Sequence, residues 1–236
     1  MKNFFCFGQP KSGTTFLQMM LNSHYELSCP SEHRLNNILK KLPELITEYN
    51  KDLIFVNNVT SNRNLSLFND EDLNLLAKYI IKLALKRGGN KKKIKYFGLK
   101  DNGIINNINL FIKLFPNEKF IFVLRDPRHT AISAWHHNIR IDKNFLNSQG
   151  NIDDWSIKIS SAWAKNLDII NEVINKKLLN IYVCKYEDLK ENKNEIKKIF
   201  EFLQVDNNIN LVKEIFKDNK FENFKNDGFF RKGGTK

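Results

Sequence analysis

Short, continuous apolar runs alternate with longer segments of helical spacing along this chain, and this alternation constrains its fold more than any other feature. The runs are Phe4–Phe7, Leu53–Val56, Ile94–Leu99, Phe120–Leu124 and Ile181–Cys184. Strands that are apolar at every position are buried on both faces, which is typical of a parallel sheet covered by helices on each side. We therefore predict an α/β fold, a three-layer domain whose central parallel sheet is flanked by helices.

The segments between these runs repeat apolar residues every three or four positions, as the buried face of a helix does. This spacing predicts helices around Phe16–Leu21, Leu73–Leu83, Trp155–Ile174, Ile196–Leu203 and Val212–Phe216. Asn69 stands before three acidic residues, as an N-cap would, and Gly88-Gly89 is placed to end the same helix.

The chain has 236 residues, 42% of them hydrophobic, which suits one domain over residues 1–236. No window approaches the roughly 18 apolar residues of a membrane span, and no secretory signal is evident. Cys6, Cys29 and Cys184 lack the spacing of a zinc site and are expected to be reduced core thiols. We expect a soluble, cytoplasmic protein.

The formal net charge is +12, from 38 basic and 26 acidic residues. Such an excess suits polyanionic partners, namely nucleic acid, a membrane surface or phosphorylated small molecules. The chain is also crowded with Asn, Lys and Ile, a bias that the base composition of a coding sequence produces as readily as function does. Because nucleic-acid-binding motifs are lacking, we expect no nucleic-acid partner.

Polar residues gather after four of the predicted strands, where an open parallel sheet binds its ligands. They are the loop Gln9–Thr15, Lys100-Asp101-Asn102, Arg125–Arg128 and Lys185–Asp188. Solvent at the strand ends explains their polarity but not the preference for positive residues at three of them. The pattern favours an anionic ligand.

The loop Pro10–Thr15 is the most informative of these stretches. A turn that contains glycine and leads into a helix exposes backbone N–H groups, and Lys11, Ser12, Thr14 and Thr15 add further donors. Simple helix capping is the alternative interpretation. The position after the first strand favours a phosphate cradle, although the lysine precedes the glycine and the loop is therefore not a Walker A motif.

Three motifs in order along the chain resemble those of sulfotransferases that use 3′-phosphoadenosine 5′-phosphosulfate (PAPS). Pro10–Thr15 is similar to their 5′-phosphosulfate loop, Arg125–Arg128 with Ser133 to their 3′-phosphate motif, and Phe230–Gly233 to their C-terminal R-K-G. Tyr186–Leu189 fits a fourth, weaker signature. The resemblance implies a P-loop NTPase-like fold, PAPS as the donor, 3′-phosphoadenosine 5′-phosphate (PAP) as the product, and no metal.

The resemblance also implies roles for particular residues. Lys11 would contact the 5′-phosphate and the bridging oxygen, and Arg125 and Ser133 would hold the 3′-phosphate. For Phe16, stacking on adenine and a core position are both open, and a frayed basic tail is the alternative for Arg231 and Lys232. The implied donor-binding residues are Lys11, Ser12, Gly13, Thr14, Thr15, Phe16, Arg125, Ser133, Tyr186, Arg231, Lys232 and Gly233.

The general base is implied by resemblance to one branch of the same family. Many small-molecule sulfotransferases show Lys-Thr-His after the central strand, whereas this chain has Lys100-Asp101-Asn102. It is in this respect similar to the tyrosylprotein sulfotransferases, which implies Glu32 as the base and Lys100, with Lys11, as catalytic cations. His33 is the neighbouring alternative to Glu32, while His136 and His137 are expected to pack or to face solvent.

The function that follows is in-line transfer of a sulfuryl group from PAPS to a hydroxyl or amine. A P-loop nucleotide kinase, a non-catalytic polyanion-binding module and an inactive donor-binding relative are the alternatives. Segments 34–70 and 138–155 are expected to shape the acceptor pocket. The acceptor's identity and the oligomeric state are not readable from the residues.

Overall fold

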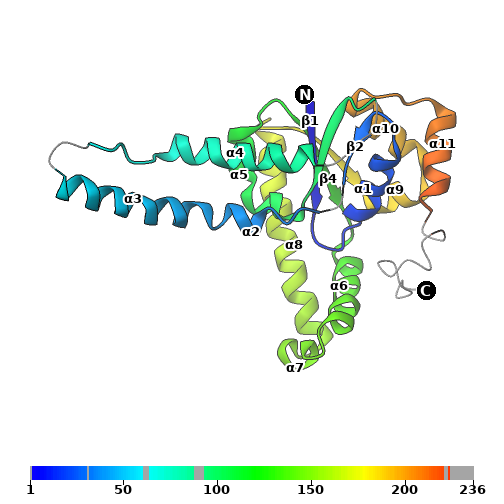
Figure 1. The fold of residues 1–236 in the computed structure, drawn as a ribbon. Helices are drawn as coiled ribbons and strands as arrows, with labels where there is room; N and C mark the ends of the chain where they lie inside the picture. Colours follow the sequence, from blue (N-terminus) through cyan, green and yellow to red (C-terminus); the bar gives the residue numbers. More distant parts are fainter. Residues whose placement is uncertain (1, 31, 61–63, 88–92, 221–222, 224–236) are drawn as a thin grey trace.

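The computed structural model describes residues 2–30, 32–60, 64–87, 93–220 and 223. Its centre is a sheet of five parallel strands in the order β2-β3-β1-β4-β5 (Figure 1). The strands are β1 Lys2–Gly8, β2 Leu27–Ser28, β3 Tyr96–Lys100, β4 Lys119–Leu124 and β5 Asn180–Lys185. The predicted α/β fold with a parallel central sheet is confirmed.

The central strand β1 explains why its apolar run does not alternate. Phe4 and Cys6 face one hydrophobic cluster, Phe5 and Phe7 face another, and all four side chains are fully buried. The first cluster packs against α1 (Thr14–Ser23), α10 (Lys193–Leu203) and α11 (Ile209–Asp218), and the second against α4 (Asp70–Lys86), α5 (Ile108–Leu114) and α8 (Ile152–Asn175). Both faces of the sheet are therefore covered, as three layers require.

The order of the strands places the carboxyl end of β1 at a topological switch point. From β1 the chain builds β2 and β3 on one side of it and then β4 and β5 on the other. A helix follows each of the last three strands: η1 (Asn102–Asn107), α6 (Pro127–Ile141) and α9 (Tyr186–Glu191). Open α/β sheets bind ligands at such a point, so the loops after β1, β3, β4 and β5 form the candidate site.

The run Leu53–Val56 was predicted to be a strand, and this prediction is wrong. It lies inside α3 (Leu42–Val59), where Leu53 is buried while Ile54 and Phe55 are 46% and 66% exposed. Four apolar residues in a row do not distinguish a strand from one turn of a helix, and here no Gly or Pro bounds the run.

Helix α3 pairs with α4 in an arm that projects from the sheet (Figure 1). We call α3, the extended residues 64–68 and α4 the helical arm, which α2 (Asn36–Leu39) joins to the body. Asn69 caps α4 through a capping box with Asp72, as its position in the sequence predicts. Gly88-Gly89 lies outside the described residues.

A second projection consists of α6, α7 (Phe145–Gln149) and the first turns of α8 (Figure 1). A small aromatic core of Trp135, Phe145 and Trp155 holds it together. Cys6, Cys29 and Cys184 are buried thiols, as predicted. Across the described part of the chain, no helix combines the length and the apolar character that crossing a membrane requires.

Candidate functional site

The loop between β1 and α1 is shaped by two glycines. A Cβ atom on Gly8 would lie 2.5 Å from the Ser12 hydroxyl and 2.6 Å from the Val123 carbonyl, so a larger residue would push the loop off the sheet. Gly13 has a φ of 95°, and a Cβ there would lie 2.1 Å from the ring of Tyr186. Both positions require glycine, one for close approach and one also for its backbone conformation.

The same loop presents polar groups that protein atoms leave unused. Gly13 is the N-cap of α1, and no side chain caps the first-turn N–H groups of this helix. The Ser12 hydroxyl is buried with no hydrogen-bond partner among the described residues. Unsatisfied donors at the start of a helix are typical of an anion site, since they direct positive partial charge to one point.

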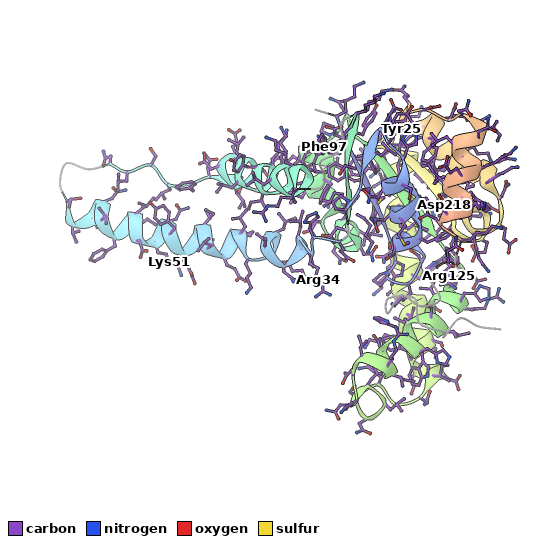
Figure 2. The ribbon with its side chains drawn as sticks, turned by 45° about the vertical axis from the view of Figure 1, so that its right-hand side comes forward. Tyr25, Arg34, Lys51, Phe97, Arg125 and Asp218 are labelled. Carbon is purple, nitrogen blue, oxygen red and sulfur yellow. The ribbon has the colours of Figure 1, made fainter. Side chains whose placement is uncertain are left out.

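Arg125, at the end of β4, joins three of the loops. Its Nη1 donates to the Lys11 carbonyl at 2.8 Å, and its guanidinium lies 4.5 Å from the centre of the Tyr186 ring. Its Nε is buried without a partner among the described residues. Figure 2 shows Arg125 where the sheet meets the α6–α8 projection. Residues that are 114 and 61 positions apart are thus brought together.

Glu32 and Lys100 meet directly. Lys100 Nζ donates to Glu32 Oε2 at 2.6 Å, and their side chains are 5% and 34% exposed. Asp101 anchors the Glu32 segment, because its carboxylate accepts from the Leu35 N–H and the Gly103 N–H, each at 2.8 Å. Burial of this carboxyl raises the pKa of Asp101. The candidate base is therefore held beside the end of β3.

The site is strongly cationic. Burial, together with the charges of Arg140 and Lys100, lowers the pKa of Lys11 to about 8. Arg140 Nη2 donates to His137 Nδ1 at 3.0 Å, and burial, together with the charges of Lys11 and Arg140, lowers the pKa of His137. Among the described residues, Lys11, Arg125 and Arg140 make no ion pair with a carboxylate. Such a cluster favours an anionic ligand.

The structure therefore brings together most of the predicted site residues that it describes. Lys11, Ser12, Gly13, Arg125 and Tyr186 are linked by the contacts above, and Glu32 with Lys100 forms the ion pair. Thr14 is buried and Thr15 half-buried in the first turn of α1, and Ser133 is half-buried on α6 without an identified contact. Arg231, Lys232 and Gly233 lie outside the described residues.

Phe16 takes the core position that the sequence left open. It is 7% exposed and belongs to the hydrophobic cluster beneath α1, with its ring centroid 6.2 Å from that of Tyr186. Its contact with adenine stays a prediction, and the structure offers little Phe16 surface for it.

Several residues of the site escaped the sequence analysis. Trp163 on α8 donates from Nε1 to the Arg125 carbonyl at 2.9 Å, and Asn166 one turn later donates to the Gln9 side chain. Arg140 and His137 are near enough to Lys11 for the charge of Arg140 to lower the pKa of Lys11 and for that of Lys11 to lower the pKa of His137. No local signal identifies Trp163 and Asn166, because each contacts a partner that is distant in the sequence.

Comparison with known proteins assigns a family to this arrangement. The model of the sulfotransferase family (Sulfotransfer_3) matches residues 3–208. Human protein-tyrosine sulfotransferase 1 is 26% identical over 142 residues, which cover 60% of this chain and 36% of the relative. The Drosophila melanogaster protein-tyrosine sulfotransferase is 25% identical over 204 residues, covering 84% of this chain and 37% of the relative. The chain thus spans less than half the length of these curated relatives.

Solved structures agree on the fold. Mouse sulfotransferase SULT7A1 complexed with PAP gives a TM-score of 0.61 at 18% identity, covering all of this chain and 76% of that one. A sulfotransferase from Alicyclobacillus acidocaldarius gives 0.55 at 16% identity, with 93% and 92% covered. The family match agrees with the resemblance seen in the motifs and speaks against a nucleotide kinase or a simple polyanion-binding module. This chain belongs to the sulfotransferase family.

Proposed function

We propose that this protein transfers a sulfuryl group from PAPS to a hydroxyl group of an acceptor. The observation that supports the proposal most is the meeting of two constellations at one edge of the sheet. Lys11, Arg125 and Tyr186 form the first, and the Glu32–Lys100 ion pair forms the second. Lys100 is close enough to Lys11 to lower the pKa of that lysine, which supports a continuous site.

The residues around Lys11 fit a donor with phosphate groups. Three kinds of hydrogen-bond donor lie there: the backbone N–H groups at the start of α1, the Ser12 hydroxyl and the Arg125 Nε, the last two without a partner among the described residues. The surrounding charge is positive. In this proposal Lys11 and the loop hold the 5′-phosphosulfate, and Arg125 and Ser133 hold the 3′-phosphate. Charge-assisted hydrogen bonds of this kind distinguish a 3′-phosphorylated nucleotide from AMP or ATP.

In PAPS the sulfuryl group is bonded to an oxygen of the 5′-phosphate, and PAP is a good leaving group. The acceptor oxygen forms a bond to sulfur while the sulfur–oxygen bond to the phosphate breaks, and PAP leaves with that electron pair. Glu32 takes the proton from the acceptor, and Lys100 and Lys11 stabilise the charge on the sulfuryl and leaving oxygens. Lys100 changes partner in this step, from the Glu32 carboxylate to a sulfuryl oxygen.

The names of the relatives suggest a tyrosine hydroxyl on a protein as the first acceptor to test. The helical arm and the α6–α8 projection extend from the body in different directions (Figure 1). We also propose a cytoplasmic location, which the three buried thiols support.

Donor binding is tested by thermal unfolding with PAP, AMP, or ATP and magnesium. A ligand at about 100 times its dissociation constant adds roughly 2.7 kcal/mol of stability. We expect PAP to raise the unfolding temperature and the other two nucleotides to have little effect. Stabilisation by ATP with magnesium but not by PAP would contradict the proposal.

The base is tested with Glu32→Gln, which keeps the shape of the side chain and removes its charge. We expect transfer from labelled PAPS to a tyrosine peptide to fall by about 100-fold or more, while PAP affinity changes little. Glu44→Gln, an exposed position at the start of α3, is the matched control and should keep full activity. Full activity of Glu32→Gln would exclude this residue as the base.

A further inference from the structure

The helical arm exposes an unusual amount of apolar surface. Eleven large hydrophobic side chains between positions 45 and 83 are 37% to 66% exposed, half of all such side chains in the described part of the chain. They are Leu45, Tyr49, Ile54, Phe55, Val59, Leu65, Leu67, Phe68, Leu75, Tyr79 and Leu83. Together they expose on the order of 1,000 Å², spread over α3, residues 64–68 and α4.

This surface belongs to a fixed structure. Asn50 exchanges two hydrogen bonds with the backbone of Phe68, at 2.8 and 2.9 Å, and Asn57 does the same with Leu65, at 2.9 and 2.8 Å. The two asparagines lie seven positions apart on one face of α3 and so fasten the extended residues 64–68 along the helix. The arm therefore presents its apolar side chains in a defined arrangement, which lowers the entropic cost of binding a partner.

The outer face of α4 shows which partner it fits. Leu75, Tyr79 and Leu83 repeat at intervals of four and are 65%, 64% and 40% exposed. Glu71 lies on the same face before this stripe, and Lys82 and Lys86 lie on it toward the other end, all three exposed. One end of the face is therefore acidic, the middle is apolar, and the other end is basic.

A face with this order of charges is complementary to itself when it is turned around. From the midpoint between Leu75 and Tyr79, Glu71 and Lys82 lie six and five residues away, or roughly 9 and 7.5 Å at 1.5 Å per residue. Two antiparallel copies of α4 thus place each Glu71 beside the other copy's Lys82 and pack Leu75 against Tyr79. A parallel pair would set like charges side by side.

The charge of the whole arm agrees with self-association. Residues 42–87 contain six acidic and six basic residues, whereas the complete chain has a net charge of +12. Like-charge repulsion between two copies is therefore weaker at the arm than the net charge of the whole chain would imply. We propose that two copies of this chain associate through the helical arm, with α4 packed antiparallel on α4 about a twofold axis. The interface is independent of the proposed sulfuryl transfer.

Sedimentation equilibrium of the full chain tests the interface. We expect the wild type to have twice the monomer mass of 27.8 kDa. Leu75→Glu is expected to be monomeric. Ile157→Glu on α8 is the control, because Ile157 is 66% exposed and Leu75 65%, and it is expected to remain dimeric. Circular dichroism and thermal unfolding of each variant show that the fold is kept. A monomeric wild type at about 100 µM, or a dimeric Leu75→Glu, overturns the proposal.

Charge exchange tests the antiparallel direction. Glu71→Lys and Lys82→Glu should each weaken the dimer about 10-fold, because the pair occurs twice across the twofold axis. The double variant restores opposite charges and should regain most of the wild-type affinity, while Lys213→Glu on α11 should have no effect. A double variant no tighter than either single variant would rule out this packing of α4.

Discussion

The charge of Lys11 should lower the free energy of unfolding of the protein when no donor is bound. Burial and two neighbouring cations lower the pKa of Lys11 from its ordinary 10.5 to about 8, and the lysine remains charged at pH 7. In a fully buried site this difference would correspond to about 3.4 kcal/mol. The Lys11 side chain is only half-buried, so solvent screening reduces the cost, and we expect about 1 kcal/mol.

Lys11→Met keeps the length of the side chain and removes the charge. We expect it to raise the free energy of unfolding at pH 7 by about 1 kcal/mol, or the unfolding temperature by about 2–4 °C, while abolishing turnover. Both residues carry a Cβ, so the positive φ of 72° at this position costs the same in each.

The pH dependence of the stability difference between wild type and Lys11→Met tests whether the lowered pKa of Lys11 is its cause. Because the pKa is lower in the folded state, the folded protein loses this proton first, and wild-type stability rises relative to Lys11→Met between about pH 8 and 10. The advantage of the variant should therefore shrink over that range, whereas Lys11→Arg, which stays charged, should show no such recovery. Saturating PAP should reverse the order at pH 7. A destabilised Lys11→Met, or a gap independent of pH, would refute this reasoning.

Two further substitutions probe the scaffold of the site. Gly13→Ala should lower the free energy of unfolding by about 2–4 kcal/mol in a denaturant titration, because φ is 95° and the new Cβ would meet the Tyr186 ring; a change below about 0.5 kcal/mol would show that the loop adapts. Asp101→Asn can accept only one of the two N–H bonds and should cost about 1–2 kcal/mol while lowering kcat. PAP affinity should change less than twofold in Asp101→Asn, and an equal loss of affinity would show that Asp101 supports the donor site instead.

Local patterns in the sequence predicted most of the strands of the sheet. The runs at Phe4–Phe7, Phe120–Leu124 and Ile181–Cys184 are neighbouring strands of a parallel sheet. The first two are apolar throughout because β1 and β4 are buried on both faces, whereas β5 is an edge strand in which Val183 is 36% exposed. The run Leu53–Val56 failed by the same criterion. It lies in an arm with little core of its own, where an apolar run need not be buried.

The sequence also predicted that the candidate residues share one edge of the sheet, since residues that follow parallel strands necessarily do so. The family resemblance pointed to Lys11, Arg125 and Lys100, and the structure places all three at this edge. Their roles, like those of Glu32 and Ser133, stay predictions.

The sequence by itself thus determined four of the five described strands, the loop after β1 and the polarity of the strand ends, which depend on residue type and near neighbours. Only the tertiary structure decided which side chains meet: the Arg125 guanidinium on the Lys11 carbonyl, Glu32 on Lys100, and Trp163 on the Arg125 carbonyl. It alone also revealed the exposed, self-complementary face of α4. Such contacts join residues 38 to 114 positions apart, and their geometry is set by how helices pack on the sheet rather than by any local preference.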